Sequence, residues 1–145
     1  MSNYEPQASY RFYVEITGIL QGYFAECTGL SVQTEIFEYK EGGLNDYTHK
    51  LPGQTKMNNI TLKRGLTRSR ELWDWMVGAD PQGGLTRYAN MSILLYDSTG
   101  TVLRRWNLQK ACAVKWTAPD FKADAKAIAV ESLEIAYHGL TIADA

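Results

Sequence analysis

Alternating apolar and polar positions run along most of the chain and predict β-strands. In residues 10–18, Phe12, Val14 and Ile16 alternate with more polar side chains, which is typical of a half-buried strand. After a short turn expected at residues 19–23, β-branched and aromatic residues predict further strands. These lie within residues 24–43, 59–67, 87–109, 110–121 and 122–139, with a hairpin turn at 97–100.

One segment has helical periodicity instead. Its apolar side chains recur at the i, i+3, i+4 and i+7 positions of an amphipathic helix: Leu72, Trp75, Met76 and Ala79. Thr67 has the character of an N-cap, and Gly78 followed by Pro81 marks the end. The pattern predicts one helix over about residues 68–78, with both of its tryptophans in the core.

Six or seven strands, joined mostly as hairpins around one helix, predict a mainly β fold. We expect two packed antiparallel sheets, sandwich-like or barrel-like, flanked by that helix. The length of 145 residues fits one domain, and residues 1–145 contain no linker and no internal repeat. The open edges of such sheets must be paired or protected, so pairing with another chain is a sensible expectation.

The stretch from Glu38 to Thr67 starts and ends like a strand but has no period in its middle. About a dozen polar and glycine-containing residues separate the two ends. Loops of this length are uncommon in compact domains and are usually functional or disordered. We therefore predict a long functional loop that projects from the subunit.

Composition narrows the class of protein. With 45% hydrophobic and 21% charged residues the chain is a folded globular protein, and its net charge of −1 gives no global case for binding nucleic acid. A basic cluster at Lys63, Arg64, Arg68 and Arg70 is better explained by solvation or by contacts between subunits. The N-terminus does not resemble a signal peptide and no window resembles a membrane span, so synthesis in the cytoplasm without membrane insertion is expected.

No set of residues typical of catalysis occurs in the sequence. His49 and His138 each stand alone, without other side chains at the spacing of metal ligands. Cys27 and Cys112 lack a CxxC pattern and are expected to be buried, reduced thiols. The glycines do not form a phosphate-binding or dinucleotide-binding fingerprint. We expect a protein that is not an enzyme and that has no cofactor and no metal.

Several short motifs occur in a specific order along the chain. They are F-x-V-E, F-x-E-C-[ST]-G-L, E-Y-x-E-G-G, H-K-L-P-G, L-K-R-G and L-W-x-W, at residues 12–15, 24–30, 38–43, 49–53, 62–65 and 72–75. With the C-terminal segment, they make the chain resemble the tail tube proteins of contractile phage tails. The resemblance is stronger to the inner-tube proteins of phage-tail-like extracellular contractile injection systems.

The resemblance implies two packed β-sheets and a flanking helix, a fold related to the type VI secretion tube protein. It also implies that six subunits form a ring, that rings stack into a rigid hollow tube, and that strands of neighbouring subunits pair around the lumen. The implied partners are further copies of the chain, a contractile sheath protein, baseplate and spike proteins, tube-terminating proteins and a protein cargo. The particle would be extracellular or anchored to a cell.

Two surfaces follow for this chain. The long loop is expected to contact a neighbouring subunit or ring through Gly42, Gly43, Leu44, Asn45, Asp46, Tyr47, His49, Lys50, Leu51, Pro52 and Gly53. The candidates for facing the lumen are Glu35, Lys115, Ser132 and Glu134.

Other functions stay open from the residues. A phage tail tube would conduct DNA instead of protein and would belong to a virion, or the chain could be a tube-initiating paralogue at the baseplate. In a different class, a monomeric β-barrel would bind a small ligand in a dry cavity. A nucleic-acid-binding barrel is disfavoured by the balanced charge.

Overall fold

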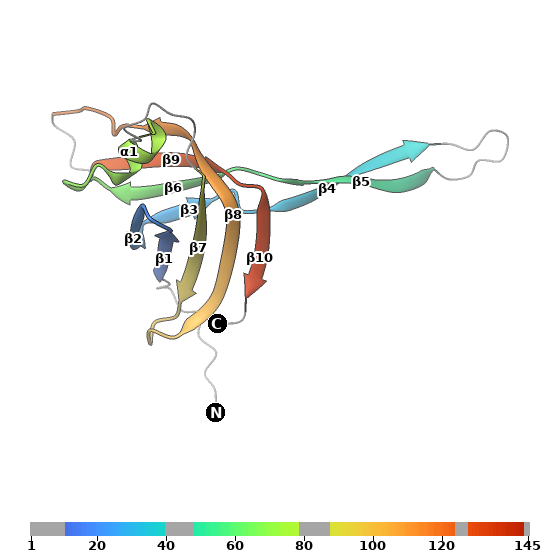
Figure 1. Ribbon diagram of the computed structural model, residues 1–145, viewed down its shortest axis with the longest axis horizontal. Coiled ribbons are helices and arrows are strands. Elements are labelled where there is room, and N and C mark those ends of the chain that lie inside the picture. The colour runs from blue at the N-terminus through green and yellow to red at the C-terminus, as the bar shows by residue number, and fades with distance from the viewer. Residues whose placement is uncertain (1–10, 40–47, 79–87, 124–127, 144–145) are drawn as a thin grey trace.

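The computed structural model describes residues 11–39, 48–78, 88–123 and 128–143, and it is mostly strand with one short helix (Figure 1). The helix is α1, Glu71–Met76. The strands are β1 (Arg11–Ile16), β2 (Leu20–Phe24), β3 (Glu26–Thr28), β4 (Val32–Tyr39), β5 (His49–Met57), β6 (Ile60–Gly65), β7 (Ala89–Tyr96), β8 (Val102–Thr117), β9 (Val130–Ala136) and β10 (Gly139–Ala143).

Eight of the strands form one antiparallel sheet in the order β2-β1-β7-β8-β9-β6-β3, with β10 also paired to β8. The 16-residue strand β8 joins two parts of this sheet, because residues 102–111 pair with β7 and β10 and residues 112–117 pair with β9. Figure 1 shows β8 curving from the first group of strands toward β6 and β9, which run across them. We call β1, β2, β7, β10 and residues 102–111 the first half, and β3, β6, β9 and residues 112–117 the second half.

One apolar cluster combines the inward-facing side chains of both halves and of α1. Its buried members are Val14, Ile16, Leu20, Phe24, Ile60, Leu62, Leu72, Trp75, Met91, Ile93, Leu108, Ala111, Leu133, Ile135 and Tyr137. They follow the alternation that predicted the strands, since Leu62 and Leu133 are opposite each other and fully buried. Burial of this apolar area is the main stabilising contribution to the fold.

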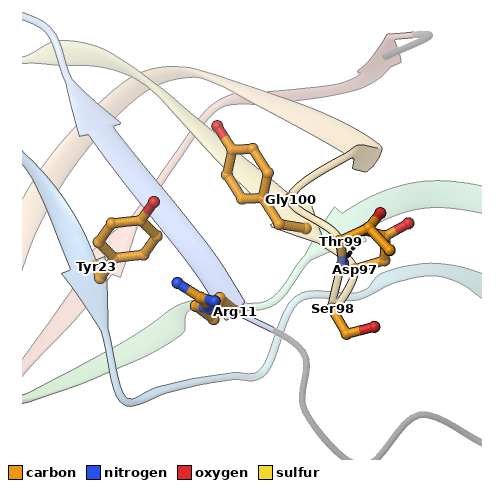
Figure 2. A pocket seen from close by; sticks show the side chains of 7 residues that line it. Arg11, Tyr23, Asp97, Ser98, Thr99 and Gly100 are labelled. Atoms are coloured by element: carbon orange, nitrogen blue, oxygen red, sulfur yellow. Dashed lines mark hydrogen bonds between the residues drawn. The ribbon is translucent and has the colours of Figure 1, made fainter.

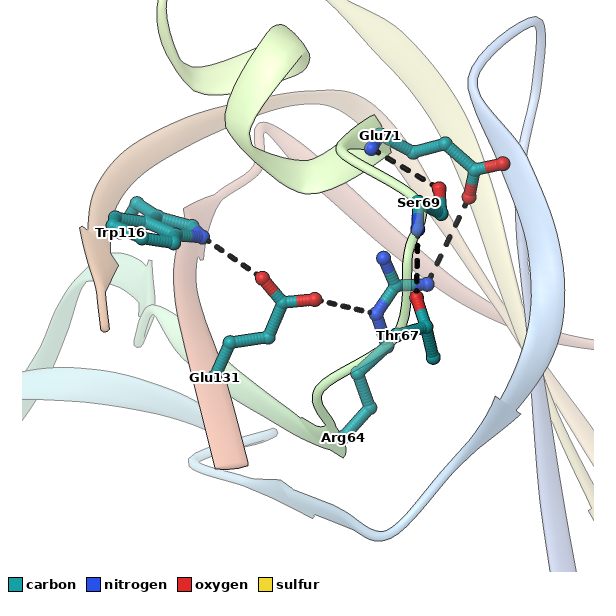
Figure 3. Close-up of polar contacts among 6 residues, drawn as sticks. All are labelled: Arg64, Thr67, Ser69, Glu71, Trp116 and Glu131. Atoms are coloured by element: carbon teal, nitrogen blue, oxygen red, sulfur yellow. Dashed lines mark hydrogen bonds and ion pairs between the residues drawn. The ribbon is translucent and has the colours of Figure 1, made fainter. Parts of the chain in front are cut away.

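A buried ion pair joins β6 to β9, and its arginine also contacts the first turn of α1 (Figure 3). The Arg64 Nε donates a hydrogen bond of 2.8 Å to Glu131 Oε1, and the indole nitrogen of Trp116 donates one of 3.2 Å to Glu131 Oε2. Arg64 Nη1 also lies 3.7 Å from Glu71 Oε2 in the first turn of the helix. Both oxygens of the buried carboxylate therefore have a donor, which is the condition under which a charged group is tolerated inside a protein.

The remaining two strands, β4 and β5, form a separate hairpin sheet that projects from the rest of the subunit (Figure 1). We call this hairpin the arm and the remainder the body. At the junction, the Asn58 N–H donates to the Ser31 carbonyl at 3.2 Å, and the Asn58 side-chain amide donates to Ser31 Oγ at 2.7 Å. Because β4 follows β3 and β5 precedes β6, the arm extends the ladder of the second half.

The arm corrects the prediction of a long loop. Residues His49–Met57 are a strand that pairs with β4, so His49 to Gly53 lie in β5 and not in a loop. The sequence signal failed because neither face of this strand is buried within the chain, so no apolar alternation marks it. Pro52, Gly53 and a bulge opposite Glu35 break the pattern further.

The mainly β fold with antiparallel sheets and one helix is confirmed, while several boundaries differ from the prediction. The helix starts at Glu71 and not near residue 68, because Thr67 Oγ1 accepts from the Ser69 N–H and Ser69 Oγ accepts from the Glu71 N–H. These side chains hold residues 67–70 in a turn. Trp75 is in the core as predicted, whereas Trp73 is 43% exposed and packs edge-on against Trp116.

Strand β2 was expected to be a turn. Its residues Leu20–Phe24 pair with β1, and the buried side chains of Leu20 and Phe24 lie at its two ends. The interior is Gln21, Gly22 and Tyr23, which carries no apolar alternation and therefore gave no strand signal.

Candidate assembly surfaces

The second half carries a polar surface on the side away from the core, which we call the polar face. Two rows cross its four strands: Glu26, Lys63, Ser132 and Thr117, and next to them Thr28, Thr61, Glu134 and Lys115. Lys63 Nζ lies 3.2 Å from Glu26 Oε2, and the Asn59 side-chain amide donates to Glu134 Oε2 at 2.9 Å. The alternate positions of these strands point into the core, so the sheet of the second half has one apolar side and one polar side.

Three of the four residues predicted to face the lumen lie together on this face. Lys115 is opposite Glu134 in the register of β8 and β9, and Ser132 is two residues away on the same side of β9. Glu35 is not with them, because it belongs to β4 in the arm, where it lies 3.7 Å from Lys56.

The polar face is bordered by two strand edges without a described strand partner. Strand β3 ends the order of the sheet, and residues 112–117 of β8 pair only with β9. Of the other described edges, β2 and β10 belong to the first half. An unpaired edge presents free N–H and C=O groups, which is a template for another strand.

The arm exposes apolar side chains on both of its surfaces. On one surface, the ring of Phe37 lies across Gly53 where a Cβ would overlap it, and the rings of Tyr39 and His49 stack at 5.1 Å. On the other surface lies Ile36, paired with Pro52. Ile36 is 52% exposed and Phe37 is 58% exposed, so the arm has no core within the subunit.

The residues predicted for the loop divide into two groups. Positions 42–47 lie outside the described residues. Lys50 and Leu51 are exposed positions of β5, opposite Glu38 and Phe37 respectively. The sequence prediction did not include the apolar residues of β4 among the contact residues. Apolar side chains occur at both odd and even positions of residues 32–39, and this pattern could have indicated a strand that is covered on both surfaces.

Potential metal ligands in the described part of the chain are scattered, and its two thiols have raised pKa values. No cluster of three or more His, Cys, Asp or Glu side chains there could hold a metal. Cys27 and Cys112 were expected to be buried, but both are half-buried. Partial burial raises the pKa of Cys27 to about 11 and also raises the pKa of Cys112, so both are neutral thiols near pH 7 and poor nucleophiles. No helix in the described segments is long and apolar enough to cross a membrane.

Three shallow hollows lie on the surface of the described part of the chain. Figure 2 shows Arg11 between Tyr23 and the turn at residues 97–100, and these residues line a hollow of about 210 Å³. An apolar hollow of about 180 Å³ is lined by Phe12, Cys27 and other core-facing side chains. A third hollow of about 300 Å³ is lined by Tyr88, Lys110 and His138. Sites for drug-sized ligands usually enclose roughly 300–1,000 Å³, so only this hollow reaches the lower end of that range, and all three are open to solvent.

Comparison with known proteins identifies the family. The sequence model of the family described as the T4-like virus tail tube protein gp19 matches residues 8–141. The chain belongs to this tail tube family. The match covers nearly all of both halves and the whole described arm, and the family is one of structural tube proteins.

Solved structures agree with this tail tube assignment. The chain is 30% identical to a chain in the cryo-EM structure of the anti-feeding prophage cap, the AFP tube terminating cap, covering 100% of this chain and 95% of that one with a TM-score of 0.81. It is 29% identical to a chain of the PVC sheath-tube complex, an extracellular contractile injection system in its extended state, covering 99% and 95% with a TM-score of 0.81. No protein with curated annotation matches the sequence.

A more distant likeness shows the fold alone. Hcp1 from Flavobacterium johnsoniae is 14% identical to this tail tube family member, with 93% of this chain and 96% of that one covered and a TM-score of 0.60. The chain therefore has the tail tube fold found in contractile injection systems and in Hcp1, as its motifs implied.

Proposed function

We propose that the chain is a structural subunit of the rigid inner tube of a contractile injection particle. Hexameric rings of this chain stack into a hollow tube, and contraction of a surrounding sheath drives the tube through a target envelope. The observation that carries the proposal is the arm, whose apolar side chains are exposed on both surfaces. A two-stranded hairpin of this kind is at best marginally stable in water, so a neighbouring copy is needed to cover it.

The edges of the polar face give the proposed ring its geometry. Residues 112–117 of β8, then β9, β6 and β3, alternate in direction across the second half. The last strand of one copy therefore runs antiparallel to the first strand of the next, so the pair can form a regular ladder. Repeating this joint around an axis closes a barrel, removes both open edges and places the polar face on one side of the wall.

The second proposed contact lies between rings. The arm continues the strand direction of β3 and β6 beyond the body, so it extends past the end of the subunit's own ladder (Figure 1). We assign it to the ring stacked on that side. Its apolar residues would supply dry contact area there, while the exposed ends of the body make the remaining contacts.

The proposed partners follow from the relatives. The chains compared above come from a sheath-tube complex and a tube terminating cap, and a further structural relative comes from an anti-feeding prophage baseplate. For this chain we propose a sheath protein, baseplate and spike proteins and a terminating protein as partners, and a protein cargo in the lumen. The particle would act outside the cell that makes it.

Electron microscopy of the purified chain, and of the chain produced together with its sheath and baseplate, tests the proposal. We expect rings or tubes for the wild type. The double substitution Phe37→Ser with Leu51→Ser should abolish stacking, because it removes apolar area from one surface of the arm. The matched control Phe37→Leu with Leu51→Met keeps that area and should still form tubes.

Three outcomes would contradict this function. A wild-type chain that stays monomeric under both conditions would contradict the proposed ring. Normal tubes from the serine variant would contradict the proposed role of the arm in stacking. Purified particles with DNA in the lumen would favour a phage tail tube.

A further inference from the structure

The charged residues of the second half and the arm are matched in pairs across neighbouring strands. Glu26 lies 3.2 Å from Lys63, and Glu35 lies 3.7 Å from Lys56. Two further acid–base pairs are opposite each other in register, Glu38 with Lys50 and Glu134 with Lys115. Inside the core, Arg64 is paired with Glu131. Each Asp, Glu, Lys or Arg described on these strands thus has a residue of opposite sign on the next strand, either within 4.0 Å or opposite it in register.

Stability does not explain the matching. The side chains of the two measured surface pairs are between 42% and 70% exposed. Exposed ion pairs of this kind contribute little to folding, because water and salt screen them and ordering long side chains costs entropy. The matching must instead be understood through the surface that it creates.

The first half shows that matching is not a general property of this chain. Its strands carry the bases Arg11, Arg104, Arg105 and Lys110 but only one acid, Glu15, which lies 3.6 Å from Arg105. The first half therefore has an excess of positive charge, whereas the described strands of the second half and the arm sum to zero. Charge balance is confined to the part of the chain that contains the polar face.

We infer that the polar face is a charge-neutral wall that accepts polypeptide cargo of either sign and does not retain polyanions such as nucleic acid. The inference rests on the proposed function, because it needs the polar face to line the lumen. A wall with one sign of charge would concentrate oppositely charged molecules along its length and would hold them back. Acid–base pairs a strand spacing apart cancel at the distance of a passing chain, so neither sign is attracted.

Probe retention by assembled tubes tests the inference. Tubes are sedimented with a fluorescent single-stranded DNA oligonucleotide, with poly-L-glutamate or with poly-L-lysine, at about 20 mM salt, where screening extends on the order of 20 Å. The variants remove one sign from the polar face: Glu26→Gln with Glu134→Gln, and Lys63→Gln with Lys115→Gln. Glutamine keeps a hydrogen-bonding oxygen at Glu134, so the bond from Asn59 is preserved.

A neutral wall makes a two-sided prediction. Loss of the two glutamates should raise retention of DNA and poly-L-glutamate about tenfold or more, and loss of the two lysines should do the same for poly-L-lysine. Neither variant should lower the retention of any probe, since the balanced wall holds none of them. The control Glu15→Gln with Asp74→Asn changes the net charge equally, on β1 and α1, and should leave lumen retention at the wild-type value.

The failures of the two proposals are distinguishable. A fall in DNA retention on removing Lys63 and Lys115, or a fall in poly-L-lysine retention on removing Glu26 and Glu134, would show a wall of one sign and overturn the inference while tubes still form. An equal response from the control variant would place the effect outside the lumen and would also overturn it. A chain that forms no rings removes the proposed function and the inference together.

Discussion

The body and the arm are both antiparallel ladders, but only the body has a core. In the body, Leu62 and Leu133 pair across β6 and β9 and are fully buried between the two halves. In the arm, Phe37 and Leu51 pair across β4 and β5 in the same way and remain about half exposed. The same backbone pairing is therefore accompanied by large apolar burial in the body and by little apolar burial in the arm. The body is stable through its own packing, whereas the order of the arm depends on what lies against it.

The largest expected effect comes from removing one apolar side chain from each ladder in the unassembled chain. Leu133→Ala should lower the free energy of unfolding by about 2–5 kcal/mol, because it removes a fully buried side chain and leaves a cavity. Phe37→Ala should change it by less than about 0.5 kcal/mol, as surface substitutions usually do. Urea denaturation of each variant measures both values.

Equal decreases in the free energy of unfolding from Leu133→Ala and Phe37→Ala would contradict this difference, since they would show that the arm packs on its own subunit. Leu133→Met, which nearly conserves volume, controls for the site in the body and should cost less than about 1.5 kcal/mol.

A second prediction concerns the backbone of the arm. Amide hydrogens of β4 and β5 should exchange much faster than those of β6 and β9 in the unassembled chain, because a hairpin without a core opens easily. In assembled rings or tubes the arm amides should become protected to a similar degree as those of the body. Hydrogen exchange read by mass spectrometry on both samples measures this. Strong protection of the arm before assembly would contradict its dependence on a neighbour.

The body was predictable from the sequence because burial imposes a period. Ile60, Leu62, Leu133 and Ile135 alternate along their strands, and the structure buries all four. Lys115, Ser132 and Glu134 could be grouped from the same parity, and they lie together on the polar face. The arm was not predictable in this way, because a strand without a buried face has no reason to alternate.

Bulges limit the same reasoning. The register of β8 and β9 shifts between Ala113 and Lys115, so Cys112 and Trp116 lie on opposite sides of the sheet although strict alternation places them on one. Glu35 stays a prediction for the lumen, and it lies in the arm next to a bulge, apart from the three candidates on the polar face. A bulge is set by local backbone geometry and leaves no mark in the apolar pattern.

The smallest expected effect concerns the hairpin of β7 and β8. Its turn is stabilised by its own residues, since Asp97 Oδ1 accepts from the backbone N–H of Thr99 at 2.9 Å and of Thr101 at 3.0 Å. Hydrogen bonds from the Thr99 hydroxyl and from these backbone groups stabilise the charged carboxylate, which lowers the pKa of Asp97 below its ordinary value of about 3.9.

The sign of the resulting pH dependence follows from linkage. A carboxylate with a lowered folded pKa contributes stability above its unfolded pKa, and that contribution is lost as the pH falls from about 4 through the folded pKa. Asp97→Asn should therefore remove a small part of the acid sensitivity of the unassembled chain, seen as a weaker fall in the urea midpoint between pH 5 and pH 3. Ser98→Ala in the same turn removes no titrating group, so it is the matched control and should leave the profile as in the wild type. An equal change from Ser98→Ala would show that the effect comes from disturbing the turn and not from the charge of Asp97.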